Sequence, residues 1–127
     1  MVNAGTALTV DALDSTSVFR GGIIVPGMKM MLQALADNTA ALKVQPGRYH
    51  DFPINTADAL YSGAMHALCG AIEQMRQRLG SEETEPKVMM SGGAAAEIAP
   101  HLTGQVEVVD NLVLEGVLAL AESTINE

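Results

Sequence analysis

The first quarter of the chain carries β-branched and apolar residues in short runs broken by turn residues, a pattern typical of β-strands. A tight turn at Gly5-Thr6 separates a first short strand from a second one, which is predicted from about Thr6 to Ala12. The polar cluster at 14–17 predicts a hairpin turn, and a third strand runs from about Val18 to Val25. Gly21-Gly22 within that strand predicts a bulge or a close approach by another segment.

Helical spacing replaces this pattern after Pro26-Gly27, with apolar residues recurring from Met28 to Leu42. A polar segment from Lys43 to Pro53 predicts an exposed loop. Asn55 or Thr56 can then cap a long helix that runs to about Leu79.

Two parts of that long helix differ in their surroundings. From Ala57 to Ile72 it is apolar nearly all round and rich in small residues, which predicts burial on two sides. In a chain of this size, one of those sides must meet another chain or a missing half. The second part is amphipathic, and its predicted outward residues are Glu73, Gln74, Arg76 and Gln77.

The remaining pattern predicts two further strands and two further helices. Lys87–Met90 is expected as a strand, and a helix from Ala94 to about Leu102 follows it. Val106–Val109 is a short strand, and Asp110 or Asn111 caps a last helix from Leu112 to about Ala121. This order predicts an α/β domain in which a three-stranded meander is extended by parallel strands.

Composition narrows the function classes. The chain has 127 residues, 48% hydrophobic and 17% charged, enough for one folded domain. A net charge of −8, with seven basic residues that form no patch, argues against a nucleic-acid surface. No apolar run approaches the ~20 residues of a membrane span, and the start lacks the basic region of a signal peptide. Cys69 has no partner for a disulfide, which fits a reducing cytoplasm.

Two glycine-bearing turns carry candidate binding chemistry. Gly5-Thr6 places a bare amide beside a hydroxyl, and Ser91-Gly92-Gly93 opens a helix N-terminus, where anions bind favourably. Either turn is also common without a ligand. If both turns meet at one end of the sheet, their amides frame one nucleotide pocket. The three histidines are too scattered to predict a metal site, and Cys69 is expected to be an inert thiol.

Taken together, five motifs resemble the C-terminal half of type III pantothenate kinase, a family that includes the Bvg accessory factor (Baf) proteins. They are Gly5-Thr6-Ala7-Leu8-Thr9-Val10-Asp11, the segment Gly21–Gly27, Asn55-Thr56 with Ala59 and Gly63, Ser91-Gly92-Gly93, and Asp110–Val113 with Gly116. The resemblance spans essentially all of the chain. It implies a ribonuclease-H-like fold of the actin, sugar-kinase and Hsp70 superfamily, with helices on both faces of the sheet.

That family transfers the γ-phosphate of ATP to pantothenate, the first step toward coenzyme A. By resemblance, ATP contacts Gly5, Thr6, Ser91, Gly92 and Gly93, with Mg²⁺ accompanying the nucleotide. Thr56 matches a threonine that touches pantothenate across a dimer, and the helix from about Thr56 to Leu79 suits that homodimer contact. Asn3 stands where the family has an aspartate that helps bind a monovalent cation, potassium or ammonium.

No catalytic residue is expected in this chain, because the family's phosphate loop and its Gly-x-Asp-Arg aspartate lie in the N-terminal half. Residues 1–127 are thus expected to form one domain that corresponds to the C-terminal half, with the N-terminal half absent. Asp11 and Asp14 are not substitutes for the missing aspartate. The first strand is short for the ~5–6 residues of a usual strand, so we expect a truncation there and a partly unpaired sheet edge.

Three hypotheses follow. The first is the nucleotide- and substrate-binding half of a cytoplasmic pantothenate kinase, inactive without its other half. The second is a noncatalytic regulator of the Baf type, a transcriptional activator, although the acidity argues against direct DNA binding. The third is a noncatalytic dimerisation domain.

Overall fold

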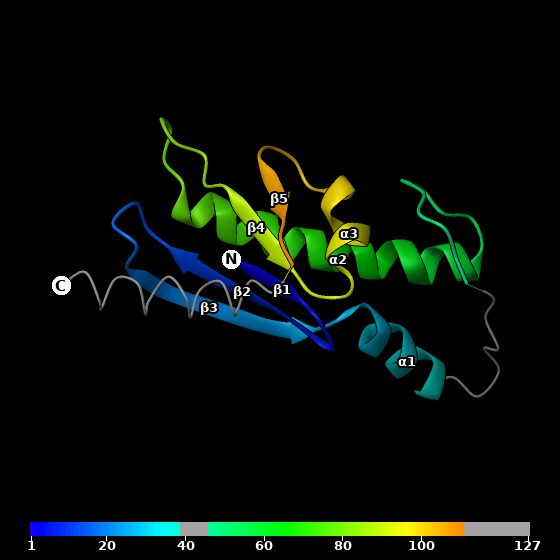
Figure 1. Cartoon of the computed structure of the whole chain (residues 1–127). Coiled ribbons are helices and arrows are strands. Elements are labelled where there is room, and N and C mark those ends of the chain that lie inside the picture. Colours follow the sequence, from blue (N-terminus) through cyan, green and yellow to red (C-terminus); the bar gives the residue numbers. More distant parts are fainter. Residues whose placement is uncertain (39–45, 111–127) are drawn as a thin grey trace.

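A five-stranded sheet organises the described part of the chain, residues 1–38 and 46–110 of the computed structural model (Figure 1). The strands lie in the order β3-β2-β1-β4-β5. The three N-terminal strands pair antiparallel, whereas β4 pairs parallel with both β1 and β5, as the sequence predicts. The bounds are β1 (Val2–Ala4), β2 (Ala7–Leu13), β3 (Phe19–Pro26), β4 (Val88–Ser91) and β5 (Val106–Val108).

Strand β1 is short, as expected, and it does not form an edge of the sheet. It lies at the centre of the sheet, between β2 and β4. Its register sets Val2 opposite Val10 on one side and opposite Met90 on the other. The edges of the described sheet are β3 and β5, and the shortness of β1 leaves Val88 and Met89 of β4 without a partner in β1, which agrees with the expected incomplete pairing.

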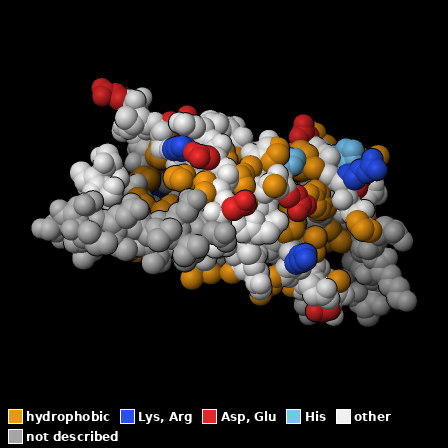
Figure 2. Space-filling model, in the orientation of Figure 1, with side chains coloured by type: hydrophobic (Ala, Val, Ile, Leu, Met, Phe, Trp, Pro, Cys, Tyr) orange, Lys and Arg blue, Asp and Glu red, His pale blue; other side chains and the backbone are white. Residues whose placement is uncertain are grey.

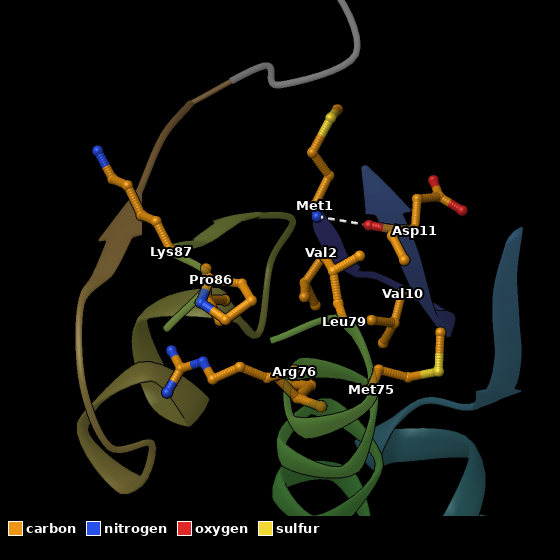
Figure 3. A pocket seen from close by; sticks show the side chains of 12 residues that line it. Met1, Val2, Val10, Asp11, Met75, Arg76, Leu79, Pro86 and Lys87 are labelled. Carbon is orange, nitrogen blue, oxygen red and sulfur yellow. Dashed lines mark hydrogen bonds between the residues drawn. The ribbon is translucent and has the colours of Figure 1, made fainter. Parts of the chain in front are cut away.

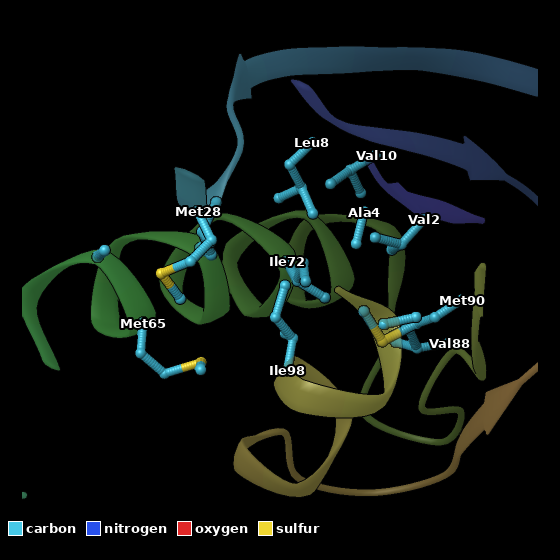
Figure 4. Close-up of a cluster of buried hydrophobic side chains, with 13 residues drawn as sticks. Val2, Ala4, Leu8, Val10, Met28, Met65, Ile72, Val88, Met90 and Ile98 are labelled. Carbon is cyan, nitrogen blue, oxygen red and sulfur yellow. The ribbon is translucent and has the colours of Figure 1, made fainter. Parts of the chain in front are cut away.

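The core lies on one face of this sheet because side chains alternate along each strand. Val2 and Ala4 of β1 point to the same face as Leu8 and Val10 of β2, and all four are buried. Burying a side chain of the size of Leu8 contributes about 1.5–3 kcal/mol. Figure 4 shows helix side chains meeting these strands from below in that view. The buried apolar side chains from the helices are Met28, Ala64, Met65, Leu68, Ile72, Ala95 and Ile98.

The bulge predicted at Gly21-Gly22 is present in the β2–β3 hairpin. The register shifts between Ala12 and Leu13, opposite Gly21, whose φ of 123° lies in the region that glycine tolerates. A side chain on Gly22 would lie 2.6 Å from the Val10 carbonyl oxygen. Both glycines therefore have structural reasons to be here.

The helices are α1 (Met28–Asn38), α2 (Thr56–Leu79) and α3 (Ala95–Ile98), and a 3₁₀ turn follows at Ala99–His101. Asn55 is the N-cap of α2, and its side chain accepts a hydrogen bond of 2.9 Å from the Asp58 amide. The helix predicted to run to Leu102 is shorter, because Pro100 cannot continue the α-helical hydrogen bonding. Within the described ranges, no helix is long and apolar enough to cross a membrane.

One prediction about α2 needs correction. Arg76, expected to face outward, is only 5% exposed and pairs with Glu73, whose side chain is partly exposed. The side of α2 that carries Gly63 and Gly70 is open in this single chain, because side chains added there would meet no atom within 4 Å, so burial of a second side by a partner stays a prediction. The predicted last helix, 112–121, lies outside the described residues, so an arrangement with helices on both faces stays a prediction.

Candidate functional site

The Gly5-Thr6 turn that follows β1 rests directly on the backbone that enters α1. The Gly27 amide donates a hydrogen bond of 2.9 Å to the Thr6 carbonyl oxygen. A Cβ atom at Gly27 would lie 2.5 Å from that same oxygen, closer than real Cβ atoms approach. Gly27 therefore lets the start of α1 pack against the turn, and it positions Thr6 beside this helix.

The second glycine turn meets the first. Because β1 and β4 are parallel neighbours, their C-terminal ends lie at the same edge of the sheet. Gly92 follows β4 with a φ of 101°, and a Cβ atom there would lie 2.6 Å from the Ala4 carbonyl oxygen. The Ala94 amide donates a 3.0 Å hydrogen bond to that oxygen. The expected convergence of the two turns is present in the structure.

These turns and helix α1 border a pocket of about 820 Å³. Its wall combines Thr6, two glycines and Lys29 with apolar residues of α1. A volume of this size accommodates a small-molecule ligand or cofactor. The lining residues are Ala4, Gly5, Thr6, Met28, Lys29, Met30, Gln33, Ala34, Asp37, Gly93, Ala94 and Glu97.

Four polar residues of this wall were missed by sequence reasoning: Lys29, Gln33, Asp37 and Glu97. The first three repeat at intervals of four along α1, so they follow one another along one side of the helix. That spacing was the available signal, but the methionine stripe on the same helix was interpreted as core. Met28 is indeed buried, whereas Met30 is exposed and lines the pocket.

Most polar groups in the wall already have partners. The Gln33 amide donates a 2.7 Å hydrogen bond to the Asp37 carboxylate. Glu97 accepts a hydrogen bond from the Tyr61 hydroxyl, and burial together with this carboxylate raises the pKa of Tyr61 to about 12. Lys29, by contrast, forms no ion pair with any described residue.

The other predicted site residues lie outside the pocket wall. Ser91 is buried at the end of β4 and pairs with Asn3 across the β1–β4 register. Asn3 points away from the core face, between Thr9 and Ser91. Thr56 opens α2 on an exposed position. Within residues 1–38 and 46–110, no group of three His, Cys, Asp or Glu side chains is arranged to hold a metal ion.

A second cavity lies at the other end of β1 and is much smaller, about 30 Å³. Met1, Asp11 and Arg76 are among the residues that line it (Figure 3). The Met1 ammonium donates a 2.8 Å hydrogen bond to the Asp11 carbonyl oxygen. This volume suits about one water molecule. Asp11 is thus a structural strand residue, far along β2 from the glycine turns.

With this geometry established, the comparisons with known proteins decide the family. The family model described as type III pantothenate kinase matches residues 1–78. The chain belongs to the type III pantothenate kinase family.

Curated members of the type III pantothenate kinase family match nearly the whole chain. The protein from Nitrosospira multiformis is 49% identical over 125 residues, which are 98% of this chain and 48% of that protein. The protein from Chromobacterium violaceum is 48% identical over 122 residues, 94% of this chain and 52% of its own length. The chain therefore spans about half the length of the curated relatives it matches.

A solved structure shares the fold. It is described as a conserved Baf family transcriptional activator from Campylobacter jejuni, with a TM-score of 0.73. The match covers 99% of this chain and 58% of the other, at 23% sequence identity. At this identity the likeness supports the mixed α/β fold and nothing finer.

Proposed function

We propose that this chain is the nucleotide- and pantothenate-binding half of a cytoplasmic type III pantothenate kinase with a ribonuclease-H-like fold. The observation that carries the proposal is the meeting of two glycine turns at one pocket of about 820 Å³. The enzyme transfers the γ-phosphate of ATP to the hydroxyl of pantothenate. The catalytic aspartate belongs to the family's other half, so this chain alone is inactive.

ATP binding falls to the two turns. Phosphoryl transfer depends on positioning and charge compensation more than on covalent chemistry, so backbone amides and hydroxyls at the phosphates are the required groups. Gly5 and Thr6 line the pocket, and the phosphate contact is assigned to the Thr6 hydroxyl, because the Gly5 amide already donates a 3.2 Å hydrogen bond to the Ala7 carbonyl oxygen. Gly93 lines the same pocket from the other side, and Gly92 and Ser91 hold its backbone in place. Mg²⁺ accompanies the nucleotide.

Asn3 is proposed as a ligand of a monovalent cation, potassium or ammonium. Its amide oxygen can coordinate such an ion but contributes no charge. Its Oδ1 atom would lie 3.3 Å from a Cβ atom built at Gly5, so this oxygen is close to the turn. A cation there would lie next to the segment that carries Thr6.

A second copy of the chain completes the pantothenate site, with Thr56 as the contacting residue. Helix α2 leaves small residues exposed at Gly63 and Gly70, which permits close approach of another helix. Just before this helix, Phe52 and Ile54 are 91% and 97% exposed. Large apolar side chains so exposed beside a smooth helix face favour a protein partner.

The decisive experiment joins this chain to the N-terminal half of the Nitrosospira multiformis relative. We expect the joined protein to phosphorylate pantothenate with ATP, and the chain alone to show no activity. Thr6→Ala should reduce kcat/KM at least about 10-fold, the loss of one charge-assisted contact. Thr16→Ala, in an exposed turn away from the pocket, is the matched control. An inactive joined protein that is folded would contradict the proposal.

The regulatory alternative has less support. Figure 2 shows acidic and basic side chains scattered over the visible face without a cluster of Lys and Arg. Binding a nucleic-acid backbone requires such a cluster. If the joined protein retarded a promoter fragment and phosphorylated nothing, the Baf-type role would replace the kinase. A dimer that bound no nucleotide would instead favour a dimerisation domain.

A further inference from the structure

Lys29 of helix α1 lines the pocket, and none of the family motifs described above includes it. We propose that Lys29 binds the phosphate groups of the nucleotide in this pocket. This inference rests on the proposed function, because it assumes that the pocket holds a nucleotide.

The first argument is position. Gly27 donates to the Thr6 carbonyl oxygen and accepts a 2.9 Å hydrogen bond from the Met31 amide, so the first turn of α1 begins against the Gly5-Thr6 turn. Lys29 belongs to that first turn and lines the same pocket as Thr6 and Gly93. Lys29 therefore stands on the part of α1 that packs against the turn carrying Thr6.

The second argument is electrostatic. A cation in the first turn of a helix faces the positive end of the helix dipole, which is unfavourable without a nearby anion. The first turn of α1 contains no acidic residue. The two carboxylates of the pocket wall, Asp37 and Glu97, hydrogen-bond to Gln33 and Tyr61 instead. In a chain of net charge −8, Lys29 thus lacks a described counter-charge at a pocket, and a phosphate would supply one.

The third argument is the division of chemistry along the pocket. Met30, Ala34 and Ala94 form an apolar part of the wall, which suits the flat face of a base. The Thr6 turn and Lys29 form the polar, cationic part. A lysine ammonium acts as a flexible point charge, a form of contact that phosphate groups accept readily. On α1 the apolar row, Met30 and Ala34, runs beside the polar row that begins at Lys29, so the wall offers a surface for a base and a cation for phosphate.

Calorimetric titration of the joined protein described above with ATP, adenosine and pantothenate tests this assignment. We expect Lys29→Ala to weaken ATP binding about 10-fold or more and to leave adenosine binding unchanged. Lys29→Arg, which keeps the charge, should restore most of the ATP affinity. Lys87→Ala is the matched control, because Lys87 is an exposed lysine that pairs with Glu107 away from the pocket.

Three outcomes would overturn the assignment. An unchanged ATP affinity, or equal losses for ATP and adenosine, would show that Lys29 does not contact phosphate. A weaker affinity for pantothenate alone would assign Lys29 to the pantothenate carboxylate instead. If the joined protein without a substitution bound neither ATP nor adenosine, the nucleotide pocket itself would be refuted, and the failure would then lie with the proposed function.

Discussion

Replacing Arg76 by methionine removes the charge at the centre of a network that joins three distant segments. Its Nη1 atom donates to the carbonyl oxygen of Thr103 and to Glu85 at 3.3 Å, and its Nη2 atom donates to the carbonyl oxygen of Gln105 at 3.3 Å. Glu73 lies 3.4 Å from Nη1 and also accepts the Thr103 amide at 3.0 Å. Arg76 thereby fixes the loop before β5 to the end of α2.

The expected loss of unfolding free energy follows from the burial of Arg76. Removing one partner of a buried ion pair costs about 3–5 kcal/mol, because the remaining groups stay desolvated. Here the Glu85 side chain is 61% exposed and can return to water, which lowers the cost. The carbonyl oxygens of Thr103 and Gln105 lose their side-chain donor. We therefore expect Arg76→Met to lower the free energy of unfolding by about 2–4 kcal/mol.

Urea unfolding followed by circular dichroism measures this loss, and Arg78→Met is the control. Arg78 is an exposed arginine on the same helix, so its replacement should change stability by about 0.5 kcal/mol or less. In Arg76→Met/Glu73→Gln the two losses should not add, because the residues share one network. Equal stabilities of Arg76→Met and Arg78→Met would refute the network as a source of stability.

Three further predictions concern single groups. Gly92→Ala should destabilise the chain and weaken ATP binding at least about 10-fold, because its Cβ atom would lie 2.6 Å from the Ala4 carbonyl oxygen and its φ is positive. Urea unfolding measures the stability and calorimetric titration the ATP affinity, and effects no larger than those of Gly93→Ala would contradict the prediction. Hydrogen bonds from the Arg48 amide and from Asn55 lower the pKa of Asp58 below 3.8, so its stabilising effect is complete above that pH and is lost as pH falls below it. Asp58→Asn should therefore reduce the fall in the free energy of unfolding at low pH, and an unchanged fall would exclude Asp58 as its source. Burial, together with Glu73, raises the pKa of Cys69 from 9.0 to about 11, so its alkylation near neutral pH should be about 100-fold slower than in the unfolded chain, and an equal rate would contradict that shift.

Local signals were sufficient for much of this fold. The β2–β3 hairpin was predictable because its turn and bulge residues act within a few positions of one another. The start of α2 followed from Asn55, whose capping role is also local. The convergence of the glycine turns was predictable once the strands were expected to be parallel, since neighbouring parallel strands end at one edge of the sheet.

Other features depend on partners that the local pattern does not reveal. Arg76 was assigned to the outer face because a charged residue in an amphipathic helix is usually solvated. Its acceptors in the Thr103–Gln105 loop are separated from it by 27 and 29 positions. Lys29 was overlooked for a similar reason, since only the approach of Thr6 and Gly93 makes its helix a pocket wall. The proposed contact of Thr56 with pantothenate requires a second copy of the chain, which a single sequence pattern does not describe.

The shortness of β1 has a consequence for how ligand and fold depend on each other. Two residue pairs join β1 to β4, Val2 with Met90 and Asn3 with Ser91, so the hairpin half of the sheet meets the other half along a narrow seam. A ligand that contacted both Thr6 and Gly93 would link the two halves of the sheet across the β1–β4 pairing. The free energy of unfolding would then increase with ligand saturation, because a ligand that binds only the folded form adds its binding free energy to stability.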